Sequence, residues 1–257
     1  MSGISFVRSG TRANQAYSTS ASISWNAATA PTPGDHLILA VSYNNCASNT
    51  VPTLAVQDNQ TGAFANTWLP LVSQGNGSMG SGFSATIAAL YLCKNVQYSG
   101  SGNFTFTVTS TGGSTRQSFS CNHVEIAGNI NVDQIGVYTS GSSLVLAATA
   151  TAAGQNATGT DFVIACLATS TNSAGAAGSD PPASGYTTLG AYSWSDNAGL
   201  TQSGYGEAAY KLLSAGSPET SQATWSGWGN DGFTCAVIAT LAPQLSGAQR
   251  LLLLGVG

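Results

Sequence analysis

The side chains best suited to chemistry in this sequence are two histidines, one of them close to a cysteine. Cys121 and His123 stand two residues apart in an apolar segment, so on a strand both would project from the same face. A thiol beside an imidazole is the pairing of a Cys–His nucleophile, but no third group that would orient the imidazole is apparent. His36 opens another apolar segment, and we expect both histidines to be structural.

The ten carboxylates are scattered along the chain, without a spacing that identifies a catalytic pair. The segment 58–62 (DNQTG) offers oxygen atoms of the kind that hard cations bind, but it lacks the ligand density of a calcium loop. We expect it to be a turn whose side chains bond the local backbone. We predict no catalytic residue, no metal site and no cofactor, and hence a protein that is not an enzyme.

The five cysteines are odd in number and widely spaced, at Cys46, Cys93, Cys121, Cys166 and Cys235. This arrangement fits neither a disulfide framework nor a CxxC metal site. All except Cys46 lie inside apolar, strand-like segments. We therefore expect these four to be small buried hydrophobic residues.

The composition excludes several classes of protein. The 257 residues include only six Lys and Arg and ten Asp and Glu, yet 42% are hydrophobic, which is ample for a core. Without a basic stripe we expect neither nucleic-acid binding nor an electrostatic membrane anchor. The longest apolar run, Leu251–Leu254, is too short to span a bilayer, and the N-terminal residues lack the apolar segment of a secretory signal.

Alternation of apolar and hydroxyl side chains is the clearest local pattern. Phe104, Phe106 and Val108 alternate with threonines, which is the period of a half-buried strand. Clusters of Gly, Ser and Asn, typical of turns, separate similar segments. These further segments are 17–25, 36–43, 84–93 and 117–126. No window has the period of an amphipathic helix, so we predict an all-β fold.

Segments of the first half of the chain are echoed in the second half, in the same order. The paired segments are 17–25 with 138–146, 34–40 with 159–165, 88–91 with 207–210, and 119–121 with 233–235. Such order indicates two copies of a β-meander of about 110–125 residues. We therefore predict an antiparallel, jelly-roll-like β-sandwich built from two sequence-similar halves.

Two arrangements of the halves are possible. They could form separate small sandwiches, or they could interleave as the halves of one larger sandwich. The second is favoured, because the join at 130–138 (INVDQIGVY) is itself strand-like and all-β domains of this size are common. The expected boundaries are an N-terminal arm over 1–16, the duplicated sandwich over 17–243 with halves at about 17–128 and 138–243, and an apolar C-terminal arm over 244–257.

A series of short motifs runs through the region 34–243. In order they are HLILAVSY (36–43), VQDNQTG (56–62), NTW (66–68), AALYLCKNV (88–96), FTFTVTS (104–110) and VEIAG (124–128). This series resembles a widespread β-sandwich family of bacterial surface proteins and bacteriophage virion proteins. The resemblance implies the fold and says little about activity.

The resemblance implies a virion protein more than a secreted module. Secreted members would carry a signal peptide and often several modules, whereas this sequence starts at Met1 and adds short arms to one unit. The implied protein is a head decoration (cement) protein or a collar or tail appendage, assembled in the host cytoplasm into the virion. It would contact copies of itself as a homo-oligomer and other virion proteins.

Two features near the C-terminus are candidate contacts. Trp225 matches the strand 104–106 of the first half, so we expect it in the core, whereas Trp228 has no counterpart and could contact a ligand or a partner. The leucines Leu251, Leu252, Leu253 and Leu254 would be exposed unless something covers them. We expect them to make assembly contacts, by folding back on their own domain or by docking on a neighbouring subunit.

A second hypothesis is a carbohydrate- or receptor-binding module of a surface or fibre protein, located outside the cell or on its surface. It would bind a host-surface glycan in loops at one end, through the aromatic faces of Trp194, Tyr205 and Trp228. A third hypothesis, a hydrolase in an all-β scaffold, would depend on His123 and Glu125.

Overall fold

The computed structural model describes most of the chain as strands, and its only helical element among the described residues is a 3₁₀ turn at Gly62–Phe64. Every strand pair described is antiparallel. The all-β sandwich expected from the sequence is therefore confirmed. The described residues are 3–10, 13–45, 48, 50–77, 85–113, 116–139, 147–152, 160–171, 185–195, 203–214, 221–226 and 232–244.

The first half of the chain, residues 3–127, forms two sheets. The larger, which we call its inner sheet, has the order β1-β9-β4-β7-β6, with β2 also pairing with β9; the smaller, its outer sheet, has the order β3-β8-β5. The strands are β1 (Ser5–Ser9), β2 (Ala13–Ser18), β3 (Ser22–Asn26), β4 (His36–Asn45), β5 (Thr53–Asp58), β6 (Trp68–Asn76), β7 (Ala85–Cys93), β8 (Thr105–Thr111) and β9 (Gln117–Ala127).

The second half, residues 130–244, also forms an inner and an outer sheet. Its inner sheet has the order β10-β16-β12-β14-β13, and its outer sheet pairs β11 with β15. The strands are β10 (Ile130–Thr139), β11 (Ala147–Ala152), β12 (Asp161–Thr171), β13 (Thr187–Ser195), β14 (Ser203–Leu213), β15 (Ser221–Ser226) and β16 (Gly232–Pro243).

The inner-sheet orders β1-β9-β4-β7-β6 and β10-β16-β12-β14-β13 are equivalent. In both, the first strand along the chain is at one edge, next to the last one, and the remaining strands follow in the same sequence. In both halves the chain passes repeatedly between the inner and the outer sheet, which is the wrapping of a jelly roll. Among the described strands, pairing stays within each half. Each half thus makes its own two sheets, and the inner sheets of the two halves pack against each other.

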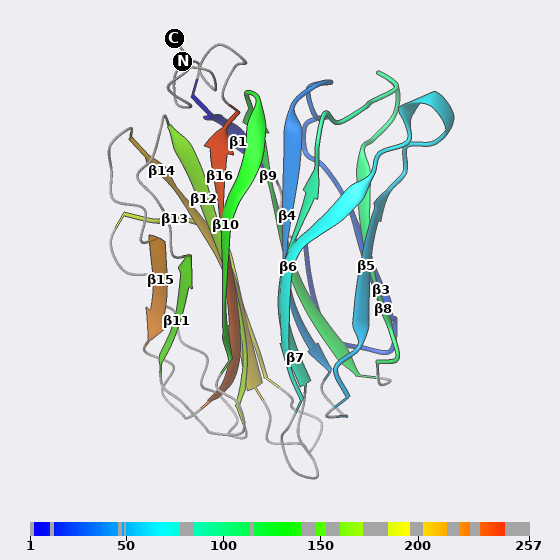
Figure 1. Cartoon of the computed structure of the whole chain (residues 1–257). Coiled ribbons are helices and arrows are strands. Elements are labelled where there is room, and N and C mark those ends of the chain that lie inside the picture. Colours follow the sequence, from blue (N-terminus) through cyan, green and yellow to red (C-terminus); the bar gives the residue numbers. More distant parts are fainter. Residues whose placement is uncertain are drawn as a thin grey trace.

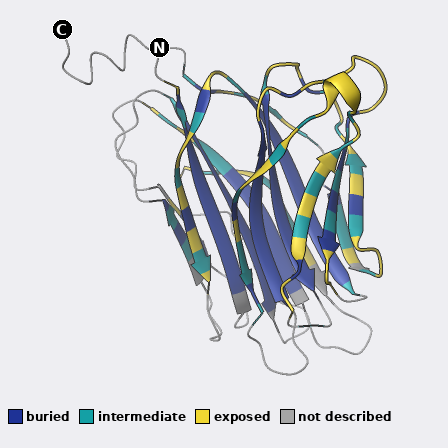
Figure 2. Ribbon diagram, turned by 45° about the vertical axis from the view of Figure 1, so that its right-hand side comes forward, coloured by how far each residue is buried: buried dark blue, intermediate teal, exposed yellow. Residues whose placement is uncertain are grey.

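The four sheets are stacked as layers, with the two inner sheets back to back in the middle (Figure 1). One apolar cluster fills the space between the inner sheets and contains Ile38 from β4 and Phe162 from β12. Further clusters lie between each inner sheet and its own outer sheet. The central strands of the inner sheets, such as β4 and β7, are therefore buried on both faces (Figure 2), which explains their nearly continuous apolar sequences.

Small side chains allow the inner sheets to approach closely. A Cβ atom placed on Gly206 of β14 would lie 2.5 Å from the Cβ atom of Ser42 on β4. The Ser42 hydroxyl donates to the carbonyl oxygen of Leu167 at 2.5 Å, and Thr86 Oγ1 lies 3.4 Å from Cys235 Sγ. Polar contacts therefore accompany the apolar packing between the halves.

The residue-by-residue echoes between the halves are not structurally equivalent. Cys121 packs beneath the outer sheet of the first half, whereas its echo Cys235 faces the other inner sheet. Ile38 and its echo Val163 also face opposite sides of their sheets. A shift by one residue reverses the face of every side chain on a strand, and strands that are apolar on both faces give no signal of register. Sequence duplication of the halves stays a prediction.

The segment expected as one strand at 17–25 is two strands, β2 and β3, because serines between them bond the local backbone. The Ser20 N–H donates to Ser18 Oγ at 2.9 Å, and the Ser20 hydroxyl donates to the Ser22 carbonyl oxygen at 2.8 Å. Such bonds compete with strand pairing. The region 1–16, expected as an arm, contributes β1 and most of β2 to the inner sheet.

The edge strands of the inner sheets are irregular, whereas their central pairs are regular. Central strands β4 and β12 pair with both neighbours without a register shift. Each edge strand contains one: Phe6/Arg8 in β1, Pro70/Val72 in β6, Val132/Gln134 in β10 and Thr188/Gly190 in β13. Bulges at edges hinder pairing with a strand of another molecule.

Candidate functional site

A partly buried ion pair joins β1 to β9. Arg8 Nε donates to Glu125 Oε2 at 2.6 Å, and the Thr32 N–H donates to Glu125 Oε1 at 2.8 Å. Arg8 Nη2 donates to the Ala30 carbonyl oxygen at 2.8 Å. These hydrogen bonds hold the Glu125 carboxylate in place. They also attach β1 and the segment that contains Ala30 and Thr32 to β9.

Electrostatics keep Glu125 ionised. Burial would raise the pKa of Glu125, but hydrogen bonds from Arg8 and Thr32 hold it below its ordinary value. Burial, together with a hydrogen bond to Glu125 and repulsion from it, raises the pKa of Asp35. The pKa values of the two carboxyl groups thus shift in opposite directions, because Arg8 stabilises the charge on Glu125, which in turn disfavours a second charge on Asp35.

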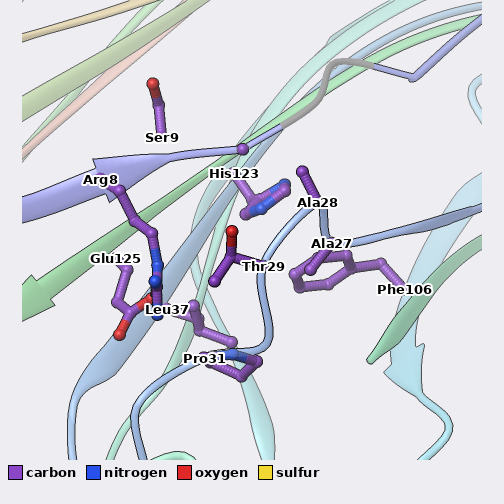
Figure 3. A pocket seen from close by; sticks show the side chains of 11 residues that line it. Arg8, Ser9, Ala27, Ala28, Thr29, Pro31, Leu37, Phe106, His123 and Glu125 are labelled. Atoms are coloured by element: carbon purple, nitrogen blue, oxygen red, sulfur yellow. The ribbon is translucent and has the colours of Figure 1, made fainter. Parts of the chain in front are cut away.

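His123 lies beside this ion pair and lines the same small cavity as Arg8, Glu125 and Phe106 (Figure 3). The Trp25 indole N–H donates to His123 Nδ1 at 3.4 Å, and the Phe106 ring centroid lies 4.5 Å from the imidazole centroid. A Cβ atom placed on Gly10 would lie 1.7 Å from His123 Nε2, so the backbone of Gly10 packs directly on the ring.

These surroundings make His123 a poor catalytic base. Burial lowers the pKa of His123 to about 4, and its Nδ1 atom already accepts the bond from Trp25. The cavity beside it, lined also by Arg8 and Glu125, measures about 30 Å³, room for about one or two water molecules. The cluster has the geometry of a clamp that fastens β1 and the 27–35 segment to β9.

Cys121 shares the outer-facing side of β9 with His123, as the two-residue spacing predicts. Burial raises the pKa of the Cys121 thiol well above its ordinary value, so the thiol stays protonated. Cys93, Cys166 and Cys235 are likewise free and buried, and burial raises the pKa of each to about 12. The prediction that these four are buried small hydrophobic residues is confirmed; Cys46 lies outside the described residues.

His36 is a second buried imidazole with both nitrogens engaged. The Asn95 N–H donates to His36 Nδ1 at 3.0 Å, so Nε2 carries the proton and donates to the Gly128 carbonyl oxygen at 2.6 Å. Burial lowers the pKa of His36. The imidazole connects the start of β4 to the turn after β7 and to the join between the halves.

The segment 58–62 is a turn, as expected. The Gln60 N–H donates to Asp58 Oδ1 at 2.9 Å, and the Trp68 indole donates to Asp58 Oδ2 at 2.8 Å. Asn59 Nδ2 donates to the Asn103 carbonyl oxygen at 2.7 Å. The described residues contain no group of three or more His, Cys, Asp and Glu side chains that could hold a metal ion.

Exposed apolar side chains gather where the edges of the two inner sheets meet. Leu69 on β6 is 49% exposed, and Ile135 on β10 is 51% exposed. With Val132 they line a groove of about 430 Å³ between β6 and β10, which Leu71 and Leu92 also line. We call this the edge groove. Contiguous exposed apolar surface on a folded protein can mark a contact site.

A neighbouring groove of about 480 Å³ lies on the other side of β6, towards β5. Trp68 and Tyr91 line it, together with Pro52, Thr53 and Ser73. The Tyr91 hydroxyl donates to the Leu54 carbonyl oxygen at 3.1 Å, so its orientation is fixed. We call this the aromatic groove.

The candidate contact residues expected from the sequence meet different outcomes. Leu251, Leu252, Leu253, Leu254 and Trp228 all lie outside the described residues. Trp225 is buried between the sheets of the second half, which confirms its expected place in the core.

Tyr205 does not present an aromatic face at a loop, and that expectation is wrong. It is buried on the face of β14 that packs against the outer sheet of the second half. Its hydroxyl donates to Glu207 Oε2 at 2.9 Å. The side chain of Trp194 lies outside the described residues.

Two important groups have no recognisable signal in the sequence. Arg8 stands in a segment expected to be an arm, far from Glu125 along the chain, so only the fold brings them together. The edge groove is also not predictable from the sequence. The segment 130–138 has the pattern of a strand, but no pattern indicates that β6 lies beside it. The alternation of Ile135 and Val137 with small or polar residues was the one available signal.

Comparison with known proteins adds no relative. No family model, no curated protein and no solved structure matches the chain. Among the described residues, no helix has the length and apolar character needed to cross a membrane. The fold defines the class, an antiparallel β-sandwich of four stacked sheets.

Proposed function

We propose that this chain is a structural protein of a bacteriophage particle, a head decoration protein or a collar or tail appendage, that acts through protein–protein contacts. The observation that carries the proposal is the edge groove, where Leu69, Val132 and Ile135 expose apolar surface at the meeting of two rigid sheets. Exposed apolar side chains that lie together are suited to contact with another protein.

Two further features support a mechanical role. The central strands of the inner sheets are buried on both faces, so the described body has a core in each space between its four layers. The resemblance of the region 34–243 to virion β-sandwich proteins favours a phage particle as the assembly. Contacts with copies of itself and with other virion proteins would be the whole of the activity.

The contact function is tested by sedimentation velocity over about 1 to 100 µM, since association depends on concentration. The chain is expected to associate, and Ile135→Lys is expected to weaken association by placing a charge in the groove. Leu212→Lys is the matched control, because Leu212 is 45% exposed on β14. If the two substitutions weaken association equally, the edge groove is not the contact surface.

The particle itself is tested by mass spectrometry of purified virions from the phage that encodes the chain. Peptides of the chain are expected at a copy number comparable with that of known structural proteins. Their absence from purified virions, with abundant protein in the infected cell, would overturn the assignment to the particle.

The aromatic groove favours a second candidate, a carbohydrate- or receptor-binding module. The partly buried Trp68 lines this groove with Thr53 and Ser73, and an aromatic ring beside hydroxyl groups is suited to stacking on a sugar ring. A glycan array measures this directly, and Trp68→Ala should abolish any signal while Ile135→Lys leaves it unchanged. An array without signal contradicts the candidate for the glycans it displays.

A further inference from the structure

The aromatic groove runs along the free edge of β5. Thr53, Leu54, Ala55 and Val56 of this strand line the groove, and among the described strands β5 pairs only with β8. Unlike the edge strands of the inner sheets, β5 pairs without a register shift, and it contains no proline. It therefore lacks the bulges and the proline that hinder the addition of a further strand to an edge.

The alternation of the backbone groups shows which residues of β5 face the open edge. The Asn59 N–H donates to the Thr105 carbonyl oxygen at 3.1 Å, in register with the pairs between β5 and β8. In an antiparallel pair, alternate residues direct both N–H and C=O towards the partner strand, so Ala55, like Asn59, faces β8. Leu54 and Val56 therefore direct their backbone groups away from β8, towards the open edge.

These outward backbone groups are available for pairing. Among the described residues, one hydrogen bond reaches them, from the Tyr91 hydroxyl to the Leu54 carbonyl oxygen, and a carbonyl oxygen has two lone pairs.

The other free edge of the same outer sheet, on β3, is different. The Ser20 hydroxyl donates to the Ser22 carbonyl oxygen at 2.8 Å and accepts from the Ser22 N–H at 3.3 Å. Both backbone groups of Ser22, which face away from β8, are thus bonded locally. The outer sheet of the first half is therefore prepared for a further strand at β5 and not at β3.

The β5 strand can pair with a second copy of itself without a mismatch between the faces of the sheet. An antiparallel pairing centred on Ala55 places Leu54 opposite Val56 of the second copy, and Thr53 opposite Gln57. Opposite residues share a face of the sheet. Leu54 and Val56 both pack on the core of the first half, whereas Thr53, Ala55 and Gln57 are exposed. Apolar residues thus meet apolar residues, and the residues with free backbone groups meet each other.

The charges around β5 also tolerate such a contact. No residue that lines the aromatic groove is charged. Asp58, the last residue of β5, lies opposite Pro52 in this register and not opposite another acid. Its carboxylate already accepts hydrogen bonds from the Gln60 N–H and the Trp68 indole, so no like charges are brought together.

We propose that two copies of this chain pair β5 with β5 in antiparallel orientation, across a two-fold axis at Ala55. The outer sheets then form one sheet, in the order β3-β8-β5 of one copy followed by β5-β8-β3 of the second. The contact is isologous, since the same surface serves both copies, and it closes at a dimer. The inference rests on the proposed contact function, to which it adds a second surface with a named partner.

The direct test is a disulfide between two copies that both carry Ala55→Cys and Cys46→Ser; the four remaining native cysteines are buried. Opposite residues of a pair without mutual hydrogen bonds have Cα atoms about 4.5 Å apart, which is within the range of a disulfide. Oxidised glutathione is therefore expected to yield a covalent dimer on a non-reducing gel.

The register supplies a matched control. Gln57→Cys lies on the same exposed face but opposite Thr53, so alone it is expected to yield at least about tenfold less dimer than Ala55→Cys. A mixture of Gln57→Cys chains with Thr53→Cys chains is expected to form the mixed dimer, because these two positions are opposite each other.

An exchange of charges tests the same contact without a disulfide. Ala55→Lys and Ala55→Glu each place like charges at the two-fold axis and are expected to raise the dissociation constant of the dimer at least about tenfold. Both are made with Ile135→Lys, so that the edge groove does not contribute, and both should keep the far-UV circular dichroism. Mixing the two variants is expected to restore association in sedimentation velocity, which a change confined to the fold of either chain would not do.

The pairing of β5 is wrong if Ala55→Cys yields no more dimer than Gln57→Cys, or if mixing the two charged variants restores nothing. It is also wrong if a glycan binds in the aromatic groove while Ala55→Cys gives no dimer. In each case, association that Ile135→Lys weakens would leave the contact function standing. A chain that stays monomeric up to about 100 µM contradicts both.

Discussion

Glu125 in the first half and Glu207 in the second are both buried carboxylates, and each accepts hydrogen bonds at both oxygens. Glu125 is paired with the Arg8 guanidinium and the Thr32 N–H. Glu207 instead accepts from neutral hydroxyls, Tyr205 at 2.9 Å and Thr188 at 2.8 Å. The two halves share a strand order and differ in how they satisfy their buried charge.

The difference separates two uses of a buried polar group. Arg8 and Glu125 lie 117 residues apart, so their ion pair fastens the beginning of the chain to the last strand of the first half. Glu207 bonds residues of its own strand and of the neighbouring strand, so it fixes a local pairing. The strand order therefore does not dictate the polar contacts, which each half has acquired from different residues.

The largest expected effect contrasts the tryptophans of the two outer sheets. Trp225→Ala should lower the free energy of unfolding by about 4 kcal/mol, because it empties a fully buried site. Trp25→Ala should cost about half as much, since Trp25 is only half-buried. Urea unfolding followed by circular dichroism measures both. Equal losses would mean that the two outer layers are equally packed.

The contact between the halves is broken by Gly206→Val. The added side chain meets Ser42 across the inner sheets, and overpacking of this kind costs about 3 kcal/mol. Thr187→Val on the exposed edge strand β13 is the control for a β-branched residue and should change little. Unchanged stability of Gly206→Val in urea unfolding would show that the sheets are not in close contact there.

Acid should weaken the first half through its histidine. The pKa of His123 in the folded chain is about 4, below its ordinary value of 6.5, so the unfolded chain binds more protons between these values. Stability is therefore complete above pH 6.5 and falls as the pH decreases towards 4, by about 2 kcal/mol at pH 5.

His36 adds to this loss of stability in acid, because its pKa is also lowered. Glu125 adds a loss below about pH 4.5, whereas the raised pKa of Asp35 acts in the opposite direction. Urea unfolding at pH 7 and at pH 5 measures the slope, and His123→Gln should make it shallower. A slope unaffected by His123→Gln contradicts the buried neutral imidazole.

The smallest effects compare the two glutamates directly. Arg8→Lys should cost about 1 kcal/mol, because an ammonium cannot bond Glu125 and Ala30 in the same geometry. Thr188→Val should cost about as much by removing a donor to Glu207. Since the Arg8 side chain is 33% exposed, added salt should reduce the first loss and leave the second unchanged. If salt changes the two stability losses equally, Glu125 and Glu207 do not differ in the charge of their partners.

The fold was accessible from the sequence because strand alternation and turn residues are local signals. The strands around Phe104 and Phe106, and the buried Trp225, followed from such patterns. Register between the halves was not accessible, since residues such as Ile38 and Val163 sit in segments that are apolar on both faces. The Arg8–Glu125 pair was hidden for another reason: its partners are brought together only by the pairing of β1 with β9.

The four buried cysteines have a consequence for the conditions in which this fold can persist. Thiols whose pKa is raised by burial present almost no thiolate, which is the reactive form in oxidation and disulfide exchange. The described structure also contains no disulfide among Cys93, Cys121, Cys166 and Cys235. Its stability should therefore be the same with strong reductant as without it, so a change of redox environment leaves this part of the chain unaltered.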